Sequence, residues 1–368
     1  MHSDAFQDLP VPRSIGEVTP EWLGLALSPD SGLRRPMVSA LRSERVGEGV
    51  GIMSEAWRVI PDYVEADPGF PRSVIVKLAS LHPENREHGT NLGLYEAEVR
   101  FYRDLAGGTS TKVPHCYAAT KDPDGADFAI VLQDLDGFVM VDQSLGLNPV
   151  QAERAVRELA ALHRSWWGRV EGPDLQWIPS LIHPRAEIMA GLWPQLWPVF
   201  AERFAASLPD GALDVGQVAS QMYLPVLRRL SEQRWTLLHM DFRCENFMFD
   251  QEGEMFVLDW QTLGRGSAAY DLAYLLGGSL PVDQRREAER TLVGLYHEEL
   301  TRDGGADLGF DELWDAYRMG HLVAGTSTAV LTGASMDLGN RRGAELVETM
   351  AARHFSAAVD HDAVSLVP

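Results

Sequence analysis

The sequence LLHMDFRCENFMF, from Leu237 to Phe249, lies in the middle of a 368-residue chain and sets polar side chains within an apolar run. Its polar residues are His239, Asp241, Arg243, Glu245 and Asn246. A strand interior excludes such groups, because each one buried without a partner costs about 1 to 3 kcal/mol. The stretch therefore predicts a loop whose polar groups are kept for a function.

A hairpin after this loop brings a further acid near it. The segment MFDQEGEMF predicts two short strands around the turn Gln251 to Glu254, and VLDWQ then places Asp259 13 residues after Asn246. Asp241, Asn246 and Asp259 can then meet at one place. Two of these oxygen ligands suit magnesium on nucleotide phosphates, and a remaining carboxylate can accept the proton of an attacking hydroxyl. Each residue taken alone fits a hydrogen-bonded turn better, but the joint spacing favours phosphoryl transfer.

Length and composition limit the class of protein. With 368 residues and 45% hydrophobic content, the chain can bury a large core in two domains. A net charge of -21 argues against a nucleic-acid partner. We find no leader and no apolar run of about 18 residues, so we expect a cytoplasmic protein without a membrane span. Cys116 and Cys244 are the only cysteines and are predicted to be free thiols.

Lysine is scarce, which makes one lysine conspicuous. The chain has 32 basic residues, and only Lys77, Lys112 and Lys121 are lysines. Lys77 lies in VIVKL, a β-branched run typical of a strand, where it can serve as a point charge for nucleotide phosphates. Alternatively, it is an edge-strand lysine whose stem covers apolar surface. A helix over Tyr95–Gly107 follows, and Glu98 on it is a candidate ion-pair partner.

Two other glutamates, Glu87 and Glu96, are alternative partners for Lys77. Upstream, VGEGVGIMS contains Gly49 and Gly51, whose backbone can approach a phosphate closely, and Ser54, which can add a hydroxyl. A loose hairpin between two strands would have the same composition.

The organisation of the chain predicts an α+β protein. We divide it into an N-terminal extension (1–40), a strand-rich domain (41–138) and a helical domain (139–368). Helices are expected at PVQAERAVRELAALHRSWWG, at LWPQLWPVFAERF, where prolines 194 and 198 should interrupt the helix, and through 282–360. A cleft between the two domains is the expected ligand site.

At these residues the sequence resembles the aminoglycoside phosphotransferase and choline kinase group of small-molecule kinases, and is nearest the ecdysteroid kinase-like branch. The segments that carry the resemblance are HMDFRCEN, LDWQ, AAYDLAYLL, VLQDL, EVRFY and ALHRSWW. It implies a bilobal protein-kinase-like fold, with a small β-rich N-terminal lobe that has one main helix and a larger helical C-terminal lobe. It further implies ATP and Mg²⁺ as cofactors and a small hydroxylated molecule as the phosphoryl acceptor: an aminoglycoside, choline or a steroid-like alcohol.

The resemblance also implies roles for single residues. Asp241 corresponds to the catalytic base, and Asn246 and Asp259 correspond to the magnesium ligands. Lys77 and Glu98 correspond to the ion pair at the nucleotide phosphates.

Further positions follow from the same motifs. The backbone around Gln133 and Leu135 corresponds to the adenine contact, and His239 to a histidine that supports the loop. The chain departs from the family pattern at Met240, where glycine is usual, and in the glycine loop.

The sequence has two alternative interpretations. In a protein kinase, a long peptide-docking segment follows the metal-binding aspartate, but here only about ten residues separate Asp259 from AAYDLAYLL. A catalytically weak or inactive kinase-like protein that binds nucleotide or ligand is the other alternative, although no residue that the chemistry needs is missing. Outside the loop, His163 and most tryptophans are expected to be packing residues, and Asp271 is expected to brace the loop.

Overall fold

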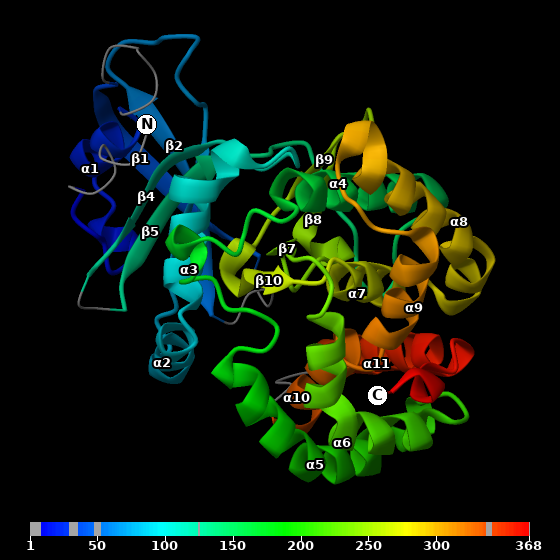
Figure 1. The fold of residues 1–368 in the computed structure, drawn as a ribbon. Helices are drawn as coiled ribbons and strands as arrows, with labels where there is room; N and C mark the ends of the chain where they lie inside the picture. The colour runs from blue at the N-terminus through cyan, green and yellow to red at the C-terminus, as the bar shows by residue number, and fades with distance from the viewer. Residues whose placement is uncertain (1–8, 29–35, 48–52, 124–125, 336–340, 368) are drawn as a thin grey trace. The chain divides into compact units, whose positions relative to one another are not determined.

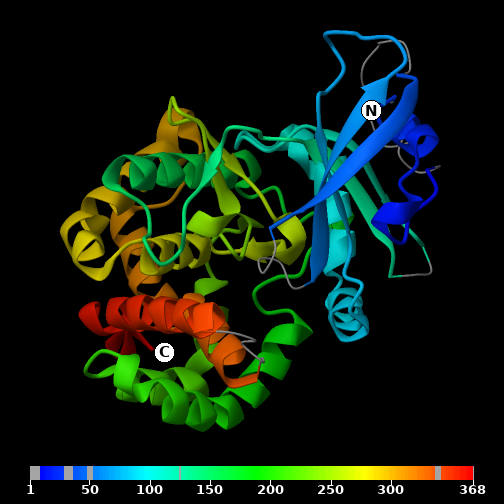
Figure 2. The ribbon, with the colours of Figure 1, turned by 180° about the vertical axis from the view of Figure 1, so that it is seen from behind.

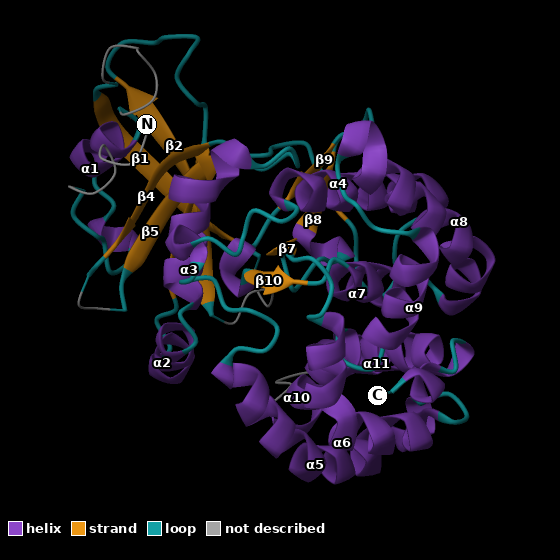
Figure 3. Ribbon diagram, in the orientation of Figure 1, coloured by secondary structure: helices purple, strands orange, loops and turns teal. Residues whose placement is uncertain are grey.

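The computed structural model describes residues 9–28, 36–47, 53–123, 126–335 and 341–367, which belong to two compact units. Unit 1 draws on Met1–Gly108, Val113–Gly137 and Leu258–Thr262, and unit 2 on Thr109–Lys112, Phe138–Val257 and Leu263–Pro368. Strands dominate unit 1 and helices dominate unit 2 (Figure 3). The predicted α+β class is confirmed.

Unit 1 is built on a five-stranded antiparallel sheet with the order β1-β2-β3-β5-β4. Its strands are β1 (Val38–Val46), β2 (Ser54–Tyr63), β3 (Val74–Ala79), β4 (Cys116–Lys121) and β5 (Phe128–Gln133). In β3, Val74, Val76 and Leu78 are buried and alternate with partly exposed residues, as in a strand that has one face on the core. This alternation sets the direction of Lys77, which lies opposite Ile130 of β5.

Helices complete unit 1. They are α1 (Pro20–Ala26), α2 (Pro83–Asn91) and α3 (Leu94–Arg100), which continues in wider turns over Phe101–Leu105. Helix α1 packs on β1, and α3 packs on β4 and β5 (Figure 1). The helix predicted over Tyr95–Gly107 is confirmed, although its second half is not regular α-helix.

Unit 2 contains short strands around the opening stretch. They are β6 (Val139–Met140), β7 (Thr236–Leu238), β8 (Phe247–Phe249), β9 (Met255–Val257) and β10 (Gly264–Gly266). Strands β8 and β9 form the predicted hairpin, in which Phe247 faces Val257. Residues 239–246 therefore form a loop between β7 and β8.

Helices make up most of unit 2. The described helices are α4 (Pro149–Trp166), α5 (Pro184–Phe204), α6 (Ala212–Leu230), α7 (Ala269–Ser279), α8 (Val282–Thr301), α9 (Phe310–Gly320), α10 (Gly325–Ser335) and α11 (Arg341–Asp360). Helices α5, α6, α10 and α11 lie together in both views, and α4 packs along α8 (Figures 1 and 2). None of the described helices is long and apolar enough to span a membrane.

The expected interruption of α5 by its prolines was wrong. The helix runs from Pro184 to Phe204 through Pro194 and Pro198. A proline removes one helical hydrogen bond and strains the preceding turn. In α5 this cost is opposed by the burial of aromatic side chains. Trp193, Trp197, Phe200 and Phe204 are all buried, against a neighbourhood that includes α6 and α10. This burial maintains the helix where local propensity would end it.

His321 and His354 are fully buried in unit 2. Neither ring nitrogen of His321 or His354 has a hydrogen-bond partner among the described residues. Burial lowers the pKa of His354 to about 3, and burial also lowers the pKa of His321 well below its usual range. Both rings are therefore neutral in the folded protein at pH 7.

We expect the stability of unit 2 to fall as the pH drops from about 6.5, the ordinary histidine pKa, towards 3. In this range the unfolded chain binds a proton that folded His354 does not, so stability is present above pH 6.5 and is lost below it. Between pH 7 and pH 5, His354 alone should cost about 2 kcal/mol. Urea unfolding of His354→Leu at both pH values should lack this part of the loss. A pH dependence equal to that of the unmodified protein would contradict the assignment.

Candidate active site

The loop 239–246 is fixed by a buried carboxylate. Asp271 of α7 is fully buried and accepts hydrogen bonds from the backbone N–H of His239 at 2.7 Å and of Met240 at 2.9 Å. His163 Nε2 lies 3.4 Å from the same carboxylate, and its Nδ1 lies 2.5 Å from the hydroxyl of Tyr296. The expected bracing role of Asp271 and the packing role of His163 are confirmed.

The carboxylate of Asp241 is surrounded by donors. Arg243 Nε lies 3.1 Å from Oδ1 and 3.4 Å from Oδ2, and the hydroxyl of Tyr274 donates to Oδ1 at 2.8 Å. The side-chain nitrogen of Asn246 donates to Oδ2 at 3.0 Å and to the backbone carbonyl of Asp241 at 2.8 Å. Unit 2 thus brings Asp241 and Asn246 together, five residues apart in sequence, with Asp241 22% exposed.

The charges around Asp241 support this geometry. Burial lowers the pKa of Arg243, but the carboxylates of Asp241 and Glu245 outweigh burial and raise it above its usual range. The Arg243 guanidinium also donates to Glu245. A permanent cation is therefore held beside Asp241.

Met240 occupies a backbone conformation that normally favours glycine. Its φ is 65°, in the left-handed region, which explains why glycine is usual between the histidine and the aspartate. The Met240 side chain lies over Gly264 of β10, where an added Cβ would come within 2.2 Å of Met240 Sδ. Glycine at 264 therefore provides the space that the methionine needs.

A second set of predicted residues lies together in unit 1. Lys77 Nζ lies 2.8 Å from Glu98 Oε1, 2.7 Å from Glu98 Oε2 and 2.7 Å from Asp259 Oδ1. The lysine side chain is 13% exposed, Glu98 2% and Asp259 27%. Of the alternative partners, Glu96 instead lies 3.8 Å from Arg100. Asp259 is the most exposed of the three, and its Oδ2 accepts a hydrogen bond from the side-chain amide of Gln261 at 3.0 Å.

The electrostatics of the triad follow from this burial. Burial lowers the pKa of Lys77, but Asp259 and Glu98 outweigh burial and raise it, so the lysine is charged at neutral pH. Burial raises the pKa of Glu98, and Lys77 opposes this rise. Asp259 has a φ of 63°, and the next residue, Trp260, stacks on Phe101 with ring centroids 3.8 Å apart.

The remaining predicted residues are placed individually. Ser54 opens β2 opposite Ala79, Gln133 ends β5, and Leu135 follows it as a buried residue. Gly49 and Gly51 lie outside the described residues.

Sequence reasoning missed Tyr274 and gave Arg243 no role. A signal for Tyr274 existed, because it lies three residues after Asp271 on the same helix, and residues three apart share a helix face.

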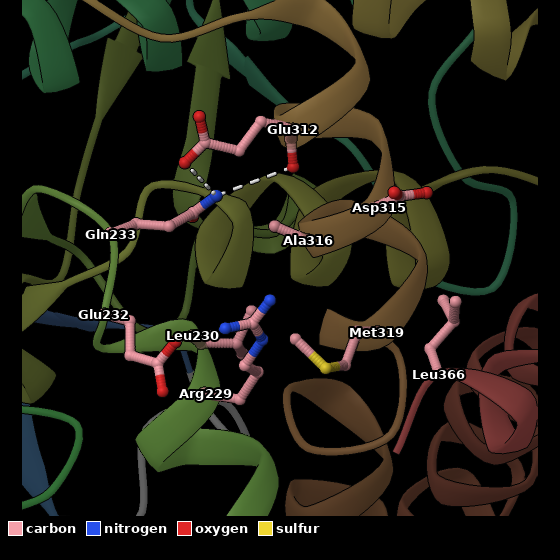
Figure 4. A pocket seen from close by; sticks show the side chains of 9 residues that line it. All are labelled: Arg229, Leu230, Glu232, Gln233, Glu312, Asp315, Ala316, Met319 and Leu366. Atoms are coloured by element: carbon pink, nitrogen blue, oxygen red, sulfur yellow. Dashed lines mark hydrogen bonds and ion pairs between the residues drawn. The ribbon is translucent and has the colours of Figure 1, made fainter. Parts of the chain in front are cut away.

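A pocket of about 400 Å³ in unit 2 contains none of the predicted site residues. It is formed by the end of α6, by α9 and by Leu366 (Figure 4). Three acids and one arginine line it, and the amide of Gln233 reaches Glu312 Oε1 at 3.3 Å. This pocket therefore lies apart from the loop chemistry, and we assign it no role.

Comparison with known proteins identifies the family. Residues 64–319 match the model of the phosphotransferase enzyme family, APH. No curated protein matches the chain.

Among solved structures, a protein of Ralstonia eutropha JMP134 described as an aminoglycoside phosphotransferase is 17% identical, with a TM-score of 0.56 over 93% of this chain and 97% of that one. Spectinomycin phosphotransferase, solved with ADP and spectinomycin, is 12% identical, with a TM-score of 0.52 over 89% of this chain and 94% of that one. A mutant aminoglycoside 2′-phosphotransferase in complex with GDP is 14% identical, with a TM-score of 0.51 over 87% and 94%.

These likenesses show that the chain has the bilobal fold of protein-kinase-like small-molecule kinases, and with the family match they define its class, a small-molecule phosphotransferase. More specifically, the chain belongs to the phosphotransferase enzyme family, because the matched region spans most of its length.

Gly264→Ala should destabilise the protein by about 1 kcal/mol, because the new methyl group displaces the Met240 side chain. The cost should be smaller when Met240 is first changed to glycine, which removes the clash and the left-handed strain together. A double-mutant cycle, measured as free energies of unfolding, tests this coupling. Equal costs in both backgrounds would show that the two side chains do not interact.

Proposed function

We propose that the protein is an ATP- and Mg²⁺-dependent kinase that phosphorylates a hydroxyl group of a small molecule, with Asp241 as the catalytic base. The observation that supports this proposal most directly is the geometry of Asp241. Its carboxylate is partly exposed, and hydrogen-bond donors hold it in one orientation within a braced loop. A general base must be fixed within reach of the proton that it takes. The ADP and GDP complexes of two structural neighbours support the use of a nucleotide.

Asn246 and Asp259 are our candidate magnesium ligands. Magnesium binds through one or two protein oxygens and fills its remaining positions with water and phosphate oxygens. The side-chain nitrogen of Asn246 donates to Asp241, so the amide oxygen of Asn246 points away from Asp241. We propose this oxygen as the magnesium ligand. No cluster of three or more histidine, cysteine or acidic residues that could form a complete protein cage occurs in the described part of the chain, and a magnesium–nucleotide site does not need one. When bound, the ion neutralises charge on the phosphates.

In unit 1, we propose that Lys77 binds the nucleotide phosphates. Glu98 then serves to hold the lysine in place, because it is almost fully buried and cannot itself reach solvent. The backbone around Gln133 and Leu135 is our candidate adenine contact, and Ser54 a candidate phosphate contact.

The nature of the acceptor and the domain limits stay predictions. Two structural neighbours are aminoglycoside phosphotransferases by name, and the ecdysteroid kinase-like branch suggests a steroid-like alcohol instead. We also propose a domain boundary at residue 138 and a cytoplasmic location. A screen of hydroxylated compounds for ATP consumption addresses the acceptor directly.

Asp241→Asn should lower turnover by about 100 to 10,000-fold, because an amide cannot accept the hydroxyl proton. The neighbouring groups of Asp241 are all donors, so the amide should also cost about 1 to 3 kcal/mol of stability. Melting temperature, Mg²⁺-ATP binding and turnover are measured on the same sample. A destabilised variant with full activity per folded molecule would show that Asp241 is only structural, and a parent protein that binds no Mg²⁺-ATP at millimolar concentration would overturn the kinase proposal.

Lys77→Met should weaken Mg²⁺-ATP binding at least 10-fold, because it removes the charge that we assign to the phosphates. It should also destabilise the protein, since it leaves the buried Glu98 without its cation. Adding Glu98→Gln should restore stability but not nucleotide binding. Lys121→Ala is the matched control, because its amine donates to the neighbouring backbone carbonyl of Asp122 and has no proposed role at the nucleotide. Calorimetric titration that gave both variants the same affinity would contradict the role of Lys77.

A further inference from the structure

Tyr274 is buried in α7, 1% exposed, yet its hydroxyl reaches the carboxylate of Asp241 at 2.8 Å. We propose that Tyr274 is a positioning residue that selects Oδ2 of Asp241 as the atom that takes the acceptor proton. The inference rests on the proposed function, because it presumes that Asp241 is the base.

The selection follows from the lone pairs of the carboxylate. Each carboxylate oxygen can accept about two hydrogen bonds. Oδ1 accepts from Tyr274 at 2.8 Å and from Arg243 Nε at 3.1 Å, so both of its positions are used. Oδ2 accepts from Asn246 at 3.0 Å and takes only the longer branch of the shared Arg243 Nε hydrogen bond, at 3.4 Å. The second position on Oδ2 is therefore the most weakly held of the four, and an incoming hydroxyl can take it.

The phenol is held as a donor by its surroundings. Burial raises the pKa of Tyr274 well above its usual range, and the neighbouring Asp241 raises it further, so the hydroxyl keeps its proton at any physiological pH. A side-chain hydrogen bond with Thr328 of α10 lowers the pKa of Tyr274. A lower pKa is what a hydroxyl that donates to the phenol oxygen produces. With Thr328 donating to its oxygen, the phenol directs its own proton to Oδ1 of Asp241.

The proposed step is balanced in atoms and charge. The acceptor hydroxyl gives its proton to Asp241 Oδ2 while its oxygen forms a bond to the γ-phosphorus of ATP. The bond from that phosphorus to the β,γ-bridging oxygen breaks, and ADP leaves with the electron pair. Tyr274 transfers no proton and keeps Oδ1 occupied throughout.

Tyr274→Phe tests the inference, because it removes the hydroxyl and keeps the ring in its buried place. We use Mg²⁺-ATP hydrolysis, with water as the acceptor, as the assay. We expect kcat to fall at least 10-fold while KM for ATP stays within twofold, since nucleotide binding does not involve Tyr274.

The matched control is Tyr317→Phe. Tyr317 is fully buried and donates to the carboxylate of Glu289 at 3.2 Å, so it loses the same kind of hydrogen bond outside the loop. We expect a similar loss of melting temperature in both variants, with kcat unchanged in Tyr317→Phe. Equal kcat values in Tyr274→Phe, Tyr317→Phe and the parent protein would overturn the inference.

A readout that needs no turnover separates this inference from the proposed function. In protein labelled with carbon-13 at the tyrosine ζ position, the signal that disappears in Tyr274→Phe belongs to Tyr274. Asp241→Asn should shift that signal, because the partner of the phenol changes, and it should leave the signal of Tyr317 in place. An unmoved Tyr274 signal would overturn the positioning role even if the parent protein hydrolysed no ATP. Absence of hydrolysis together with a shifted signal would count against the kinase proposal and leave the contact established.

Discussion

The geometry of the loop depends on one buried carboxylate. Asp271 has no solvent exposure, and it accepts the backbone N–H groups of His239 and Met240 at 2.7 and 2.9 Å. If it were lost, two buried N–H groups would be unpaired, at about 1 to 3 kcal/mol each. Because the backbone on which Asp241 stands is fixed in this way, donors such as Tyr274 can determine which carboxylate atom faces outward. Bracing of the backbone and orientation of the side chain are thus separate tasks, both performed by α7.

The backbone is strained next to Asp241, at Met240, and at Asp259 itself. Met240 and Asp259 both have φ values in the left-handed region, which costs a non-glycine residue roughly 1 to 2 kcal/mol. Each strained residue adjoins a firm anchor: the bonds to Asp271 in one case and the stack of Trp260 on Phe101 in the other. Strain at such positions persists only where the surrounding packing fixes the backbone.

Much of the fold could be predicted from the sequence, because its elements have strong local signals. The β-branched run in VIVKL and the turn in FDQEGE predicted β3 and the β8–β9 hairpin. Strand β4, CYAATK, was missed because it lacks a β-branched run and owes its conformation to pairing with β5. The same limit applied to α5, where buried aromatic side chains outweigh two prolines. Among the candidate site residues, Glu98 as the partner of Lys77 was expected from the family resemblance, whereas the phenol of Tyr274 depends on a contact 33 residues away in sequence.

The scarcity of lysine has a consequence for the chemistry of the protein surface. Amine-directed reagents find only Lys77, Lys112 and Lys121 among the side chains of the whole sequence. Lys112 is engaged by Glu254, and Lys77 is enclosed by two carboxylates that keep its amine protonated and unreactive. Acylation or cross-linking through lysine should therefore act at very few points. The 29 arginines, which keep their charge under all ordinary conditions, make the cationic surface of this acidic protein almost inert to such reagents.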